Sequence, residues 1–272
     1  MSYIEEQFGL EEAVVVITGA GGILASSLAE AFVRAGAKVS LWVRRSEVVE
    51  ETRALYAPMA SSPDRLQVLA ADAGDKARVA AAYAETKAAL GSPNVLVNAV
   101  GGNKGKGPFV DADPSVFDDI LRLNLMAGLL VPTQVFAAEW LKSGVKGSII
   151  NLASMGSYVP LSGVWAYNAA KAGVLNLTQA CAKEFGAAGI RVNAIAPGFF
   201  LGKQNKALLV ANEATGELTP RGADVVRRTP FARFGKAEEL RGAALFLANP
   251  KVSGFVTGVC IPVDGGFLVD CI

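Results

Sequence analysis

Short apolar runs recur along the chain and alternate with longer stretches in which apolar residues repeat at helical spacing. The runs are residues 13–17, 39–43, 95–97, 149–152 and 259–263. Their length and near-continuous hydrophobicity are typical of strands buried on both faces. Residues 23–36, which follow the first run, have the period of an amphipathic helix. The alternation predicts an α/β fold, a doubly wound parallel sheet with helices on both faces.

Length and composition agree with a single domain spanning residues 1–272. The chain has 272 residues, of which 51% are hydrophobic and 29 are glycine, as a sheet buried on both faces requires. No linker, low-complexity tract or internal repeat divides it. The net charge of +1 gives no reason to expect a nucleic acid or an anionic membrane as partner.

Three further features restrict the class of protein. Residues 1–6 lack the basic and apolar regions of a signal peptide, and no apolar run is long enough to span a bilayer, so we expect a cytoplasmic protein. Cys181, Cys260 and Cys271 are scattered and odd in number, which favours reduced thiols. The chain has no histidine. This excludes histidine zinc sites and leaves Ser154 without the base of a Ser-His triad, and we expect no metal.

A glycine turn follows the first apolar run. Thr18-Gly-Ala-Gly-Gly22 joins that run to the helical stretch, and the next strand, 38–43, arrives at the spacing of a Rossmann βαβ unit. Glycines let the main chain approach a phosphate, and the first amides of the helix point at it. Many strand-to-helix turns need glycine for a positive φ, so the turn alone is a weak signal. In this context it predicts a dinucleotide site.

Tyr167 and Lys171 stand four residues apart in a helical segment, and Ser154 lies thirteen positions upstream of the tyrosine. Positions i and i+4 share a helix face, so the phenol and the ammonium can converge. A nearby positive charge lowers the phenol pKa from its ordinary value of about 10, toward the range useful for exchanging protons with a substrate hydroxyl. The alternative for the pair alone is a partly buried tyrosine beside a solvated lysine.

Taken together, these motifs resemble the short-chain dehydrogenase/reductase family over nearly the whole chain. The glycine turn is one residue tighter than the family's TGxxxGxG, residues 98–101 correspond to its NNAG segment, and residues 263–266 match a further segment. Asp72 matches the acidic residue that contacts the adenine. The resemblance implies a coenzyme site formed by Thr18, Gly19, Gly21, Gly22, Ile23, Leu24, Arg44, Arg45, Asp72, Ala73, Asn98, Gly101, Tyr167, Lys171, Pro197, Gly198 and Phe200.

The resemblance also implies four catalytic residues, Asn124, Ser154, Tyr167 and Lys171. In the family's scheme the tyrosine takes the alcohol proton in oxidation and returns it in reduction. The lysine lowers the tyrosine pKa and binds the nicotinamide ribose, the serine orients the substrate oxygen, and the asparagine holds a water linking the lysine to solvent. For the serine and the asparagine, ordinary capping or loop hydrogen bonding is the alternative.

The end of the second strand bears on the choice of coenzyme. Family members that use NAD carry an acidic residue there, which binds the ribose 2′-hydroxyl. In this sequence the position is Val43, followed by Arg44 and Arg45. Without the carboxylate nothing repels a 2′-phosphate, and a guanidinium can bind it through two hydrogen bonds. We therefore favour NADP, with Arg44 as the principal contact. NAD remains an alternative, with the arginines as a solvated pair.

Two basic segments are expected to border the substrate. The loop after the fourth strand holds Asn103, Lys104 and Lys106, and the predicted lid, about 199–235, holds cations and amides. These side chains suit an anionic substrate, although each lysine alone could be a solvated surface residue. The substrate residues predicted here are Asn103, Lys104, Lys106, Ser154, Lys203, Gln204 and Asn205, and the lid also carries Arg221, Arg227, Arg228 and Arg233.

These segments resemble one branch of the family, the D-mannonate oxidoreductases (fructuronate reductases) of the short-chain type. The resemblance rests on Gly101-Gly-Asn103, Pro197-Gly-Phe-Phe200, Gln204-Asn205, Arg233-Phe-Gly235 and the segment 256–267. The sequence differs from the branch at Lys104-Gly105, where the branch has His-Pro, at Gly202, where it has threonine, and at Lys206, where it has arginine. A sugar acid is implied, and a sulfonated sugar would fit the basic residues equally well.

Other functions stay open at this point. A reductase of this fold could act on a polyol or a 3-oxoacyl thioester, for which a less basic entrance would be expected. A non-catalytic nucleotide-sensing protein is the alternative from a different class, and such proteins usually lack the tyrosine or the lysine. The resemblance implies a homotetramer, or else a homodimer. The apolar tail 266–272 is consistent with burial at an interface, and also with folding back onto its own subunit.

Overall fold

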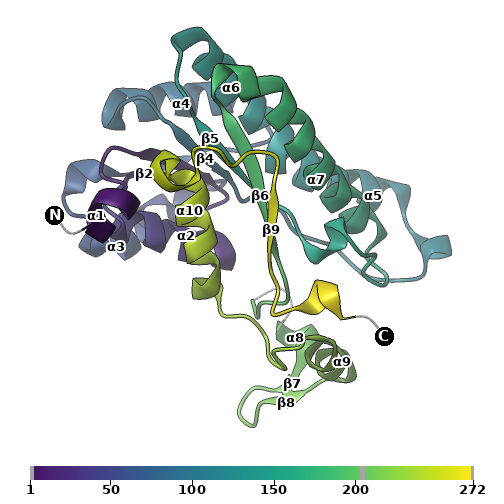
Figure 1. Cartoon of the computed structure of the whole chain (residues 1–272). Helices are drawn as coiled ribbons and strands as arrows, with labels where there is room; N and C mark the ends of the chain where they lie inside the picture. The colour runs from purple at the N-terminus through teal and green to yellow at the C-terminus, as the bar shows by residue number, and fades with distance from the viewer. Residues whose placement is uncertain (1–2, 203–205, 271–272) are drawn as a thin grey trace.

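The computed structural model describes residues 3–202 and 206–270. Seven parallel strands form one sheet in the order β3-β2-β1-β4-β5-β6-β9 (Figure 1). They are β1 (Val14–Thr18), β2 (Lys38–Val43), β3 (Leu66–Ala70), β4 (Val95–Asn98), β5 (Ser148–Leu152), β6 (Arg191–Pro197) and β9 (Cys260–Val263). The predicted doubly wound parallel sheet is confirmed. Its strand order reverses between β1 and β4, where such sheets bind ligands at their carboxyl edge.

Helices cover both faces of the sheet. One face packs on α2 (Ile23–Arg34), α3 (Val49–Tyr56) and α10 (Arg241–Ala248), and the other on α4 (Lys76–Leu90), α6 (Val131–Ser143) and α7 (Trp165–Phe185). The shorter helices are α1 (Tyr3–Phe8), α5 (Pro114–Leu121) and α11 (Pro250–Ser253). Val15 and Ile17 of β1 pack into the first layer, whereas Val16 between them packs into the second. Burial on both faces explains why the strands are continuous apolar runs.

An aromatic cluster anchors α4 and α6 to the sheet. The ring of Phe136 contacts Trp42 of β2, Tyr83 of α4 and Trp140 of α6, with centroid distances of 5.7, 4.9 and 5.6 Å. Each such pair adds about 0.5–1.5 kcal/mol beyond area burial. Gly147, before β5, is needed beside it, because an added Cβ would lie 2.3 Å from the Trp140 ring.

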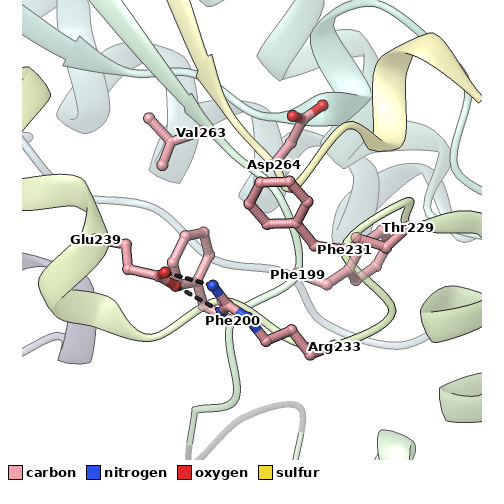
Figure 2. A pocket seen from close by; sticks show the side chains of 10 residues that line it. Phe199, Phe200, Thr229, Phe231, Arg233, Glu239, Val263 and Asp264 are labelled. Atoms are coloured by element: carbon pink, nitrogen blue, oxygen red, sulfur yellow. Dashed lines mark hydrogen bonds and ion pairs between the residues drawn. The ribbon is translucent and has the colours of Figure 1, made fainter.

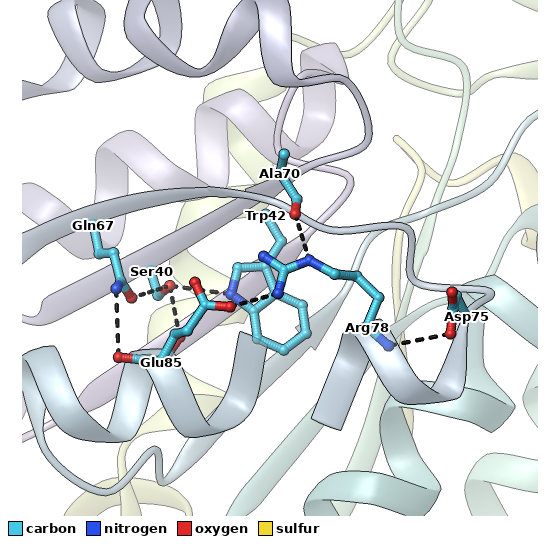
Figure 3. A network of polar contacts seen from close by, with 8 residues as sticks. Ser40, Trp42, Gln67, Ala70, Asp75, Arg78 and Glu85 are labelled. Atoms are coloured by element: carbon cyan, nitrogen blue, oxygen red, sulfur yellow. Dashed lines mark hydrogen bonds and ion pairs between the residues drawn. The ribbon is translucent and has the colours of Figure 1, made fainter. Parts of the chain in front are cut away.

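A polar network holds α4 against β2 and β3 (Figure 3). The Ser40 hydroxyl contacts Gln67 Oε1 at 3.0 Å, and Arg78 Nε donates to the Ala70 carbonyl at 2.7 Å. Asp75 caps the start of α4 by accepting from two of its first amides. These bonds fix the turn that follows β3, and this turn belongs to the carboxyl edge of the sheet.

Residues 199–235 leave the sheet after β6 and return to it. They contain α8 (Lys206–Leu209), the antiparallel pair β7 (Val210–Asn212) and β8 (Glu217–Leu218), and α9 (Pro220–Arg228). The two ends of the segment meet where the Gly235 amide donates to the Phe199 carbonyl at 2.9 Å. Figure 1 shows the segment beyond the carboxyl ends of β6 and β9, beside the C-terminus. Its role as a substrate lid stays a prediction.

One helical stretch differs from the expectation that no apolar segment could span a bilayer. Within the described residues, Pro114–Ser143 is long and apolar enough to do so by length and composition. It is continuous because α5, a π-helical segment (Arg122–Leu130) and α6 follow one another without a break. The fold buries 61% of its most apolar window, as in a core helix, and a cytoplasmic location stays a prediction.

Candidate active site

The four predicted catalytic residues come together at the carboxyl edge of the sheet. Ser154 lies two residues after β5, Tyr167 and Lys171 lie in the first two turns of α7, and Asn124 lies in the π-helical segment. The Ser154 hydroxyl is close enough to the Tyr167 phenol to lower its pKa, and Lys171 Nζ is 5.7 Å from the centroid of the tyrosine ring. A Cβ added at Gly101 would lie 2.9 Å from Asn124 Oδ1 and 3.2 Å from Lys171 Nζ. All four side chains therefore border one small space.

Burial controls the charge of Lys171. Its side chain is only 4% exposed, and Nζ donates to the Leu152 carbonyl at 2.7 Å. Removal from water lowers the pKa of the ammonium from 10.5 to about 8. The lysine is therefore mostly charged at neutral pH but titrates within an accessible range.

The expected lowering of the Tyr167 pKa is not what this structure shows. Burial raises the pKa of the phenol above 10, and the hydrogen bond with Ser154 opposes that rise in part. The spacing of Tyr167 and Lys171 indicates only the attraction between phenolate and ammonium. In the folded chain, loss of solvation disfavours the charged form of each partner, and this effect dominates for the phenol.

Asn124 occupies a wide helical turn. Its side chain is fully buried; Nδ2 donates to the carbonyls of Gly102 and Ile120 at 2.8 and 2.9 Å, and Oδ1 accepts from the Gly102 amide at 3.1 Å. π-helical turns often occur at functional sites. These bonds fix the loop after β4 beside Lys171, while the predicted water at Asn124 stays a prediction.

Ser157, which sequence reasoning missed, joins the segment carrying Ser154 to α7. Its hydroxyl donates to the Lys171 carbonyl at 2.6 Å and accepts from the Ser154 amide at 3.3 Å. Asn168 adds a second connection through both main-chain groups of Leu161. The three-residue spacing of Ser154 and Ser157 is a capping-box pattern, and that signal could have been found in the sequence.

The glycine turn has the features that a dinucleotide pyrophosphate requires. Gly19 has a φ of +64°, and a Cβ there would lie 2.9 Å from the Val100 side chain. Gly21 and Gly22 are exposed, and Gly22 caps α2 without a side-chain hydrogen bond to its first amides. Because no side chain in the described part of the structure caps these amides, the exposed helix end can offer its first N–H groups to an anion. Ile23 is also exposed and Leu24 is partly buried.

Other predicted coenzyme residues take two kinds of position. Arg44 and Arg45 at the end of β2 are exposed, and within residues 3–202 and 206–270 neither forms an ion pair. Asp72 is exposed after β3, where Oδ1 accepts from the Gly74 amide at 2.8 Å, and Ala73 beside it is buried. The three charged side chains are thus available to a bound dinucleotide.

Thr18 and Asn98 are fully buried and use their side chains within the fold. Thr18 Oγ1 accepts from the Ala99 amide at 3.2 Å, tying β1 to β4. Asn98 Nδ2 donates to Asn151 Oδ1 at 2.9 Å and to Thr133 Oγ1 at 3.1 Å. Any contact between these two residues and a coenzyme would therefore involve their main chain.

Pro197 and Gly198 lie where β6 approaches β9. The Gly198 amide donates to the Val263 carbonyl at 2.9 Å, and a Cβ at this glycine would lie 2.6 Å from Asp264 Cα. Phe200 is buried and lines a small cavity of about 80 Å³ at the base of the segment 199–235. Figure 2 shows the phenyl rings and the Arg233–Glu239 ion pair around this cavity, a cluster that sequence reasoning did not anticipate.

Several basic residues of the predicted substrate site and lid are paired with carboxylates. Lys104 Nζ lies 3.6 Å from Asp119 Oδ2, and Lys206 Nζ lies 2.6 Å from Glu213 Oε2. The cations of the predicted lid that pair with carboxylates are Lys206, Arg227, Arg228 and Arg233. Acidic neighbours thus neutralise much of the charge that the sequence suggested. Asn103 bonds within its own loop, to the Gly105 carbonyl at 2.7 Å. The predictions for Lys203, Gln204 and Asn205 lie outside the described residues.

A parallel sheet with a glycine turn at its switch point and a Ser-Tyr-Lys-Asn cluster at its carboxyl edge defines a nicotinamide-dependent oxidoreductase. A family model of the short-chain dehydrogenase type, described as enoyl-(acyl carrier protein) reductase, matches residues 19–268. An uncharacterized oxidoreductase, UxuB, of Bacillus subtilis (strain 168) is 39% identical over 267 residues, with 93% of this chain and 94% of the relative covered.

Two solved structures are similar over almost their whole length. A Haemophilus influenza protein described as a "putative D-Mannonate oxidoreductase", with bound NAD, has a TM-score of 0.88 and 34% identity, covering 98% of this chain and 99% of that one. A gluconate 5-dehydrogenase from Burkholderia cenocepacia J2315, in complex with NADP and tartrate, has a TM-score of 0.86 and 29% identity, covering 99% and 100%. The chain belongs to the short-chain dehydrogenase/reductase family and is an NAD(P)-dependent enzyme.

Proposed function

We propose that this enzyme interconverts a secondary alcohol and a ketone on an anionic sugar derivative, either a sugar acid such as mannonate or fructuronate or a sulfonated sugar. The observation that carries the reaction type is the convergence of Tyr167, Ser154, Lys171 and Asn124 beside a helix end suited to a pyrophosphate. The sugar acid is supported by similarity to the mannonate and gluconate enzymes above.

The protein's own residues would place the coenzyme and control one proton. Gly19, Gly21 and Gly22 would hold the pyrophosphate, and Asp72 the adenine. When bound, the nicotinamide supplies the hydride chemistry. Lys171, whose Nζ donates to the Leu152 carbonyl, would hold the nicotinamide ribose.

Tyr167 would exchange the proton of the substrate hydroxyl. Because burial raises the pKa of its phenol, the neutral form dominates at pH 7, and this form is the proton donor that ketone reduction needs. Ser154, beside the phenol, would orient the substrate oxygen. Lys171 would stabilise the phenolate that follows proton donation, since its ammonium is mostly charged below about pH 8.

Replacement of Tyr167 by Phe separates an enzyme from a nucleotide-sensing protein. The variant keeps the ring and loses the acid, so we expect coenzyme binding to persist while turnover falls by at least about a thousandfold. Coenzyme fluorescence would measure binding, and coenzyme absorbance would measure turnover. A parent protein that binds coenzyme and turns over no carbonyl compound would favour the sensor.

NADP is the proposed coenzyme, with Arg44 as the principal contact to the 2′-phosphate. The guanidiniums of Arg44 and Arg45 support it, since both are exposed and form no ion pair with any residue that the structure describes. We expect Arg44→Ala to raise KM for NADPH about ten- to hundredfold, as loss of a charged hydrogen bond predicts, and to leave KM for NADH nearly unchanged. A parent enzyme that prefers NADH would contradict the assignment.

A panel of substrates tests whether the enzyme prefers an anionic sugar. Aldonates, ketouronates, sulfosugars, neutral polyols and 3-oxoacyl thioesters would each be assayed with NAD and NADP in both directions. We expect the acidic sugars to have the highest kcat/KM. Equal rates on polyols would contradict the anion, and a preference for thioesters would favour the other class of carbonyl substrate.

We also propose a homotetramer. The support is a set of exposed apolar side chains, namely Met126, Tyr158, Val159, Val259 and Val269. Sedimentation equilibrium would measure the mass, and a monomer at micromolar concentration would exclude the proposal.

A further inference from the structure

The loop after β4 is attached to the segment that begins the catalytic helix. The Gly107 amide donates to the Gly163 carbonyl at 3.2 Å, and Trp165 Nε1 donates to the Gly107 carbonyl at 3.0 Å. The Phe109 ring packs edge-on against Trp165, with centroids 5.6 Å apart at 85°. Trp165 lies two residues before Tyr167, so these contacts tie the loop to the tyrosine's own helical turn.

The side chain of Lys106 packs over Gly163, which leaves room for it. This glycine has a φ of +74°, and a Cβ there would lie 2.7 Å from Lys106 Cγ and 3.1 Å from Cε. The aliphatic stem of the lysine therefore lies across a position where any side chain would interfere. Gly163 lies two residues before α7 begins, so the stem contacts the segment that leads into the helix of Tyr167.

The two lysines of this loop differ in what surrounds their charge. Lys104 has a carboxylate within 4 Å, at Asp119. Lys106 is exposed, and no ion pair involves it among the residues that the structure describes. The ammonium of Lys106, whose aliphatic stem packs at Gly163, is therefore available to a carboxylate or a sulfonate of the substrate. The ammonium of Lys104 would first have to leave Asp119.

We infer that Lys106 binds the acidic group of the substrate and that Trp165 is the positioning residue that holds its loop in place. This inference rests on the proposed function, and it assigns substrate charge recognition to one of the two lysines that the sequence could not distinguish. Trp165 acts through Gly107 and needs no contact with the substrate.

The first experiment compares Lys106→Met with Lys104→Met, which remove the same charge from the same loop. We expect Lys106→Met to raise KM for the acidic sugar about ten- to hundredfold with kcat changed less than threefold, and Lys104→Met to change KM less than threefold. On a neutral polyol of equal carbon number, both variants should match the parent. Coenzyme affinity and melting temperature serve as folding controls.

The second experiment follows hydrogen exchange of residues 102–111 in the coenzyme-bound enzyme. Trp165→Phe keeps a ring beside Phe109 and removes the N–H donor. We therefore expect faster exchange of the Gly107 amide, and a rise in KM relative to the parent that is larger for the acidic sugar than for the polyol. Unchanged exchange would overturn the positioning role of Trp165, whether or not a substrate has been found.

The two experiments separate failure of this inference from failure of the proposed function. Turnover of acidic sugars with equal KM changes in the two lysine variants would overturn the role of Lys106 and leave the proposed function standing. A parent enzyme that turns over no acidic sugar would overturn the proposed function and, with it, the role of Lys106. The exchange measurement would still decide the role of Trp165.

Discussion

Lys171→Met should stabilise the coenzyme-free protein at neutral pH while abolishing its activity. No carboxylate among the described residues forms an ion pair with this buried ammonium, and burial lowers its pKa from 10.5 to about 8. At about 1.4 kcal/mol per pKa unit, the charged lysine costs the native state roughly 3 kcal/mol at pH 7. Methionine removes that cost and fills a similar volume.

Part of this gain is offset by the lost hydrogen bond. The Leu152 carbonyl accepts from Nζ at 2.7 Å, and leaving it without a donor costs about 1–2 kcal/mol. The net increase in unfolding free energy is therefore about 1–2 kcal/mol at pH 7, a rise of a few degrees in melting temperature. Active sites commonly trade stability for function in this way.

The pH dependence gives the test its direction. A lysine whose native pKa is depressed destabilises the native state fully below about pH 8, and the effect fades as the pH rises toward 10.5. The stability advantage of the variant should therefore shrink by about 2 kcal/mol between pH 7 and pH 10. Denaturant melts of parent and variant at both values would measure it.

Lys183→Met is the matched control, because Lys183 lies on the same helix but is exposed. It should change stability by less than about 0.5 kcal/mol at either pH. If the Lys171 variant is less stable than the parent at pH 7, or if its advantage is the same at pH 7 and pH 10, then burial of the charge is not what sets the pKa, and the reasoning fails.

Two further substitutions test the geometry of the site. Gly101→Ala should lower kcat at least about tenfold, because its Cβ would lie 2.9 Å from Asn124 Oδ1 and 3.2 Å from Lys171 Nζ; Gly107→Ala, with no atom within 4 Å of its Cβ, is the control for the same change. Equal rates in the two alanine variants would contradict the crowding. Ser157→Ala removes the hydroxyl that bonds the main chain of Lys171, and it should lower kcat about tenfold and melting temperature by a few degrees. Unchanged kcat, measured by coenzyme absorbance, would show that this bond does not position the catalytic groups.

Much of the fold follows from features that a linear sequence carries directly. The strands are short apolar runs because a doubly covered sheet leaves no face for water. The five predicted runs lie within a residue or two of β1, β2, β4, β5 and β9, whereas β3 and β6 had no predicted range. Tyr167 and Lys171 converge because four residues make about one helical turn. Ser154 joins them because β5 ends at the same edge of the sheet.

What the sequence did not reveal depends on partners that only the folded chain brings together. The lid arginines look like free cations until Asp224 and Glu239 are placed beside them. The rise in the phenol pKa depends on burial, which no spacing of Tyr167 and Lys171 reports. Trp165 looks like an ordinary aromatic residue at a helix start until the loop after β4 meets it.

The π-helical segment Arg122–Leu130 has a consequence for the helix that contains it. On one side of the segment α5 packs on α7, and on the other α6 directs Phe136 and Trp140 into the layer over β2. Each residue of an α-helix turns the backbone by roughly 100°. Deleting a single residue here to restore regular α-helical winding would rotate α5 relative to α6. One of the two helices would then lose its present packing face. The wide turn therefore allows one uninterrupted helix to serve two neighbours that face in different directions.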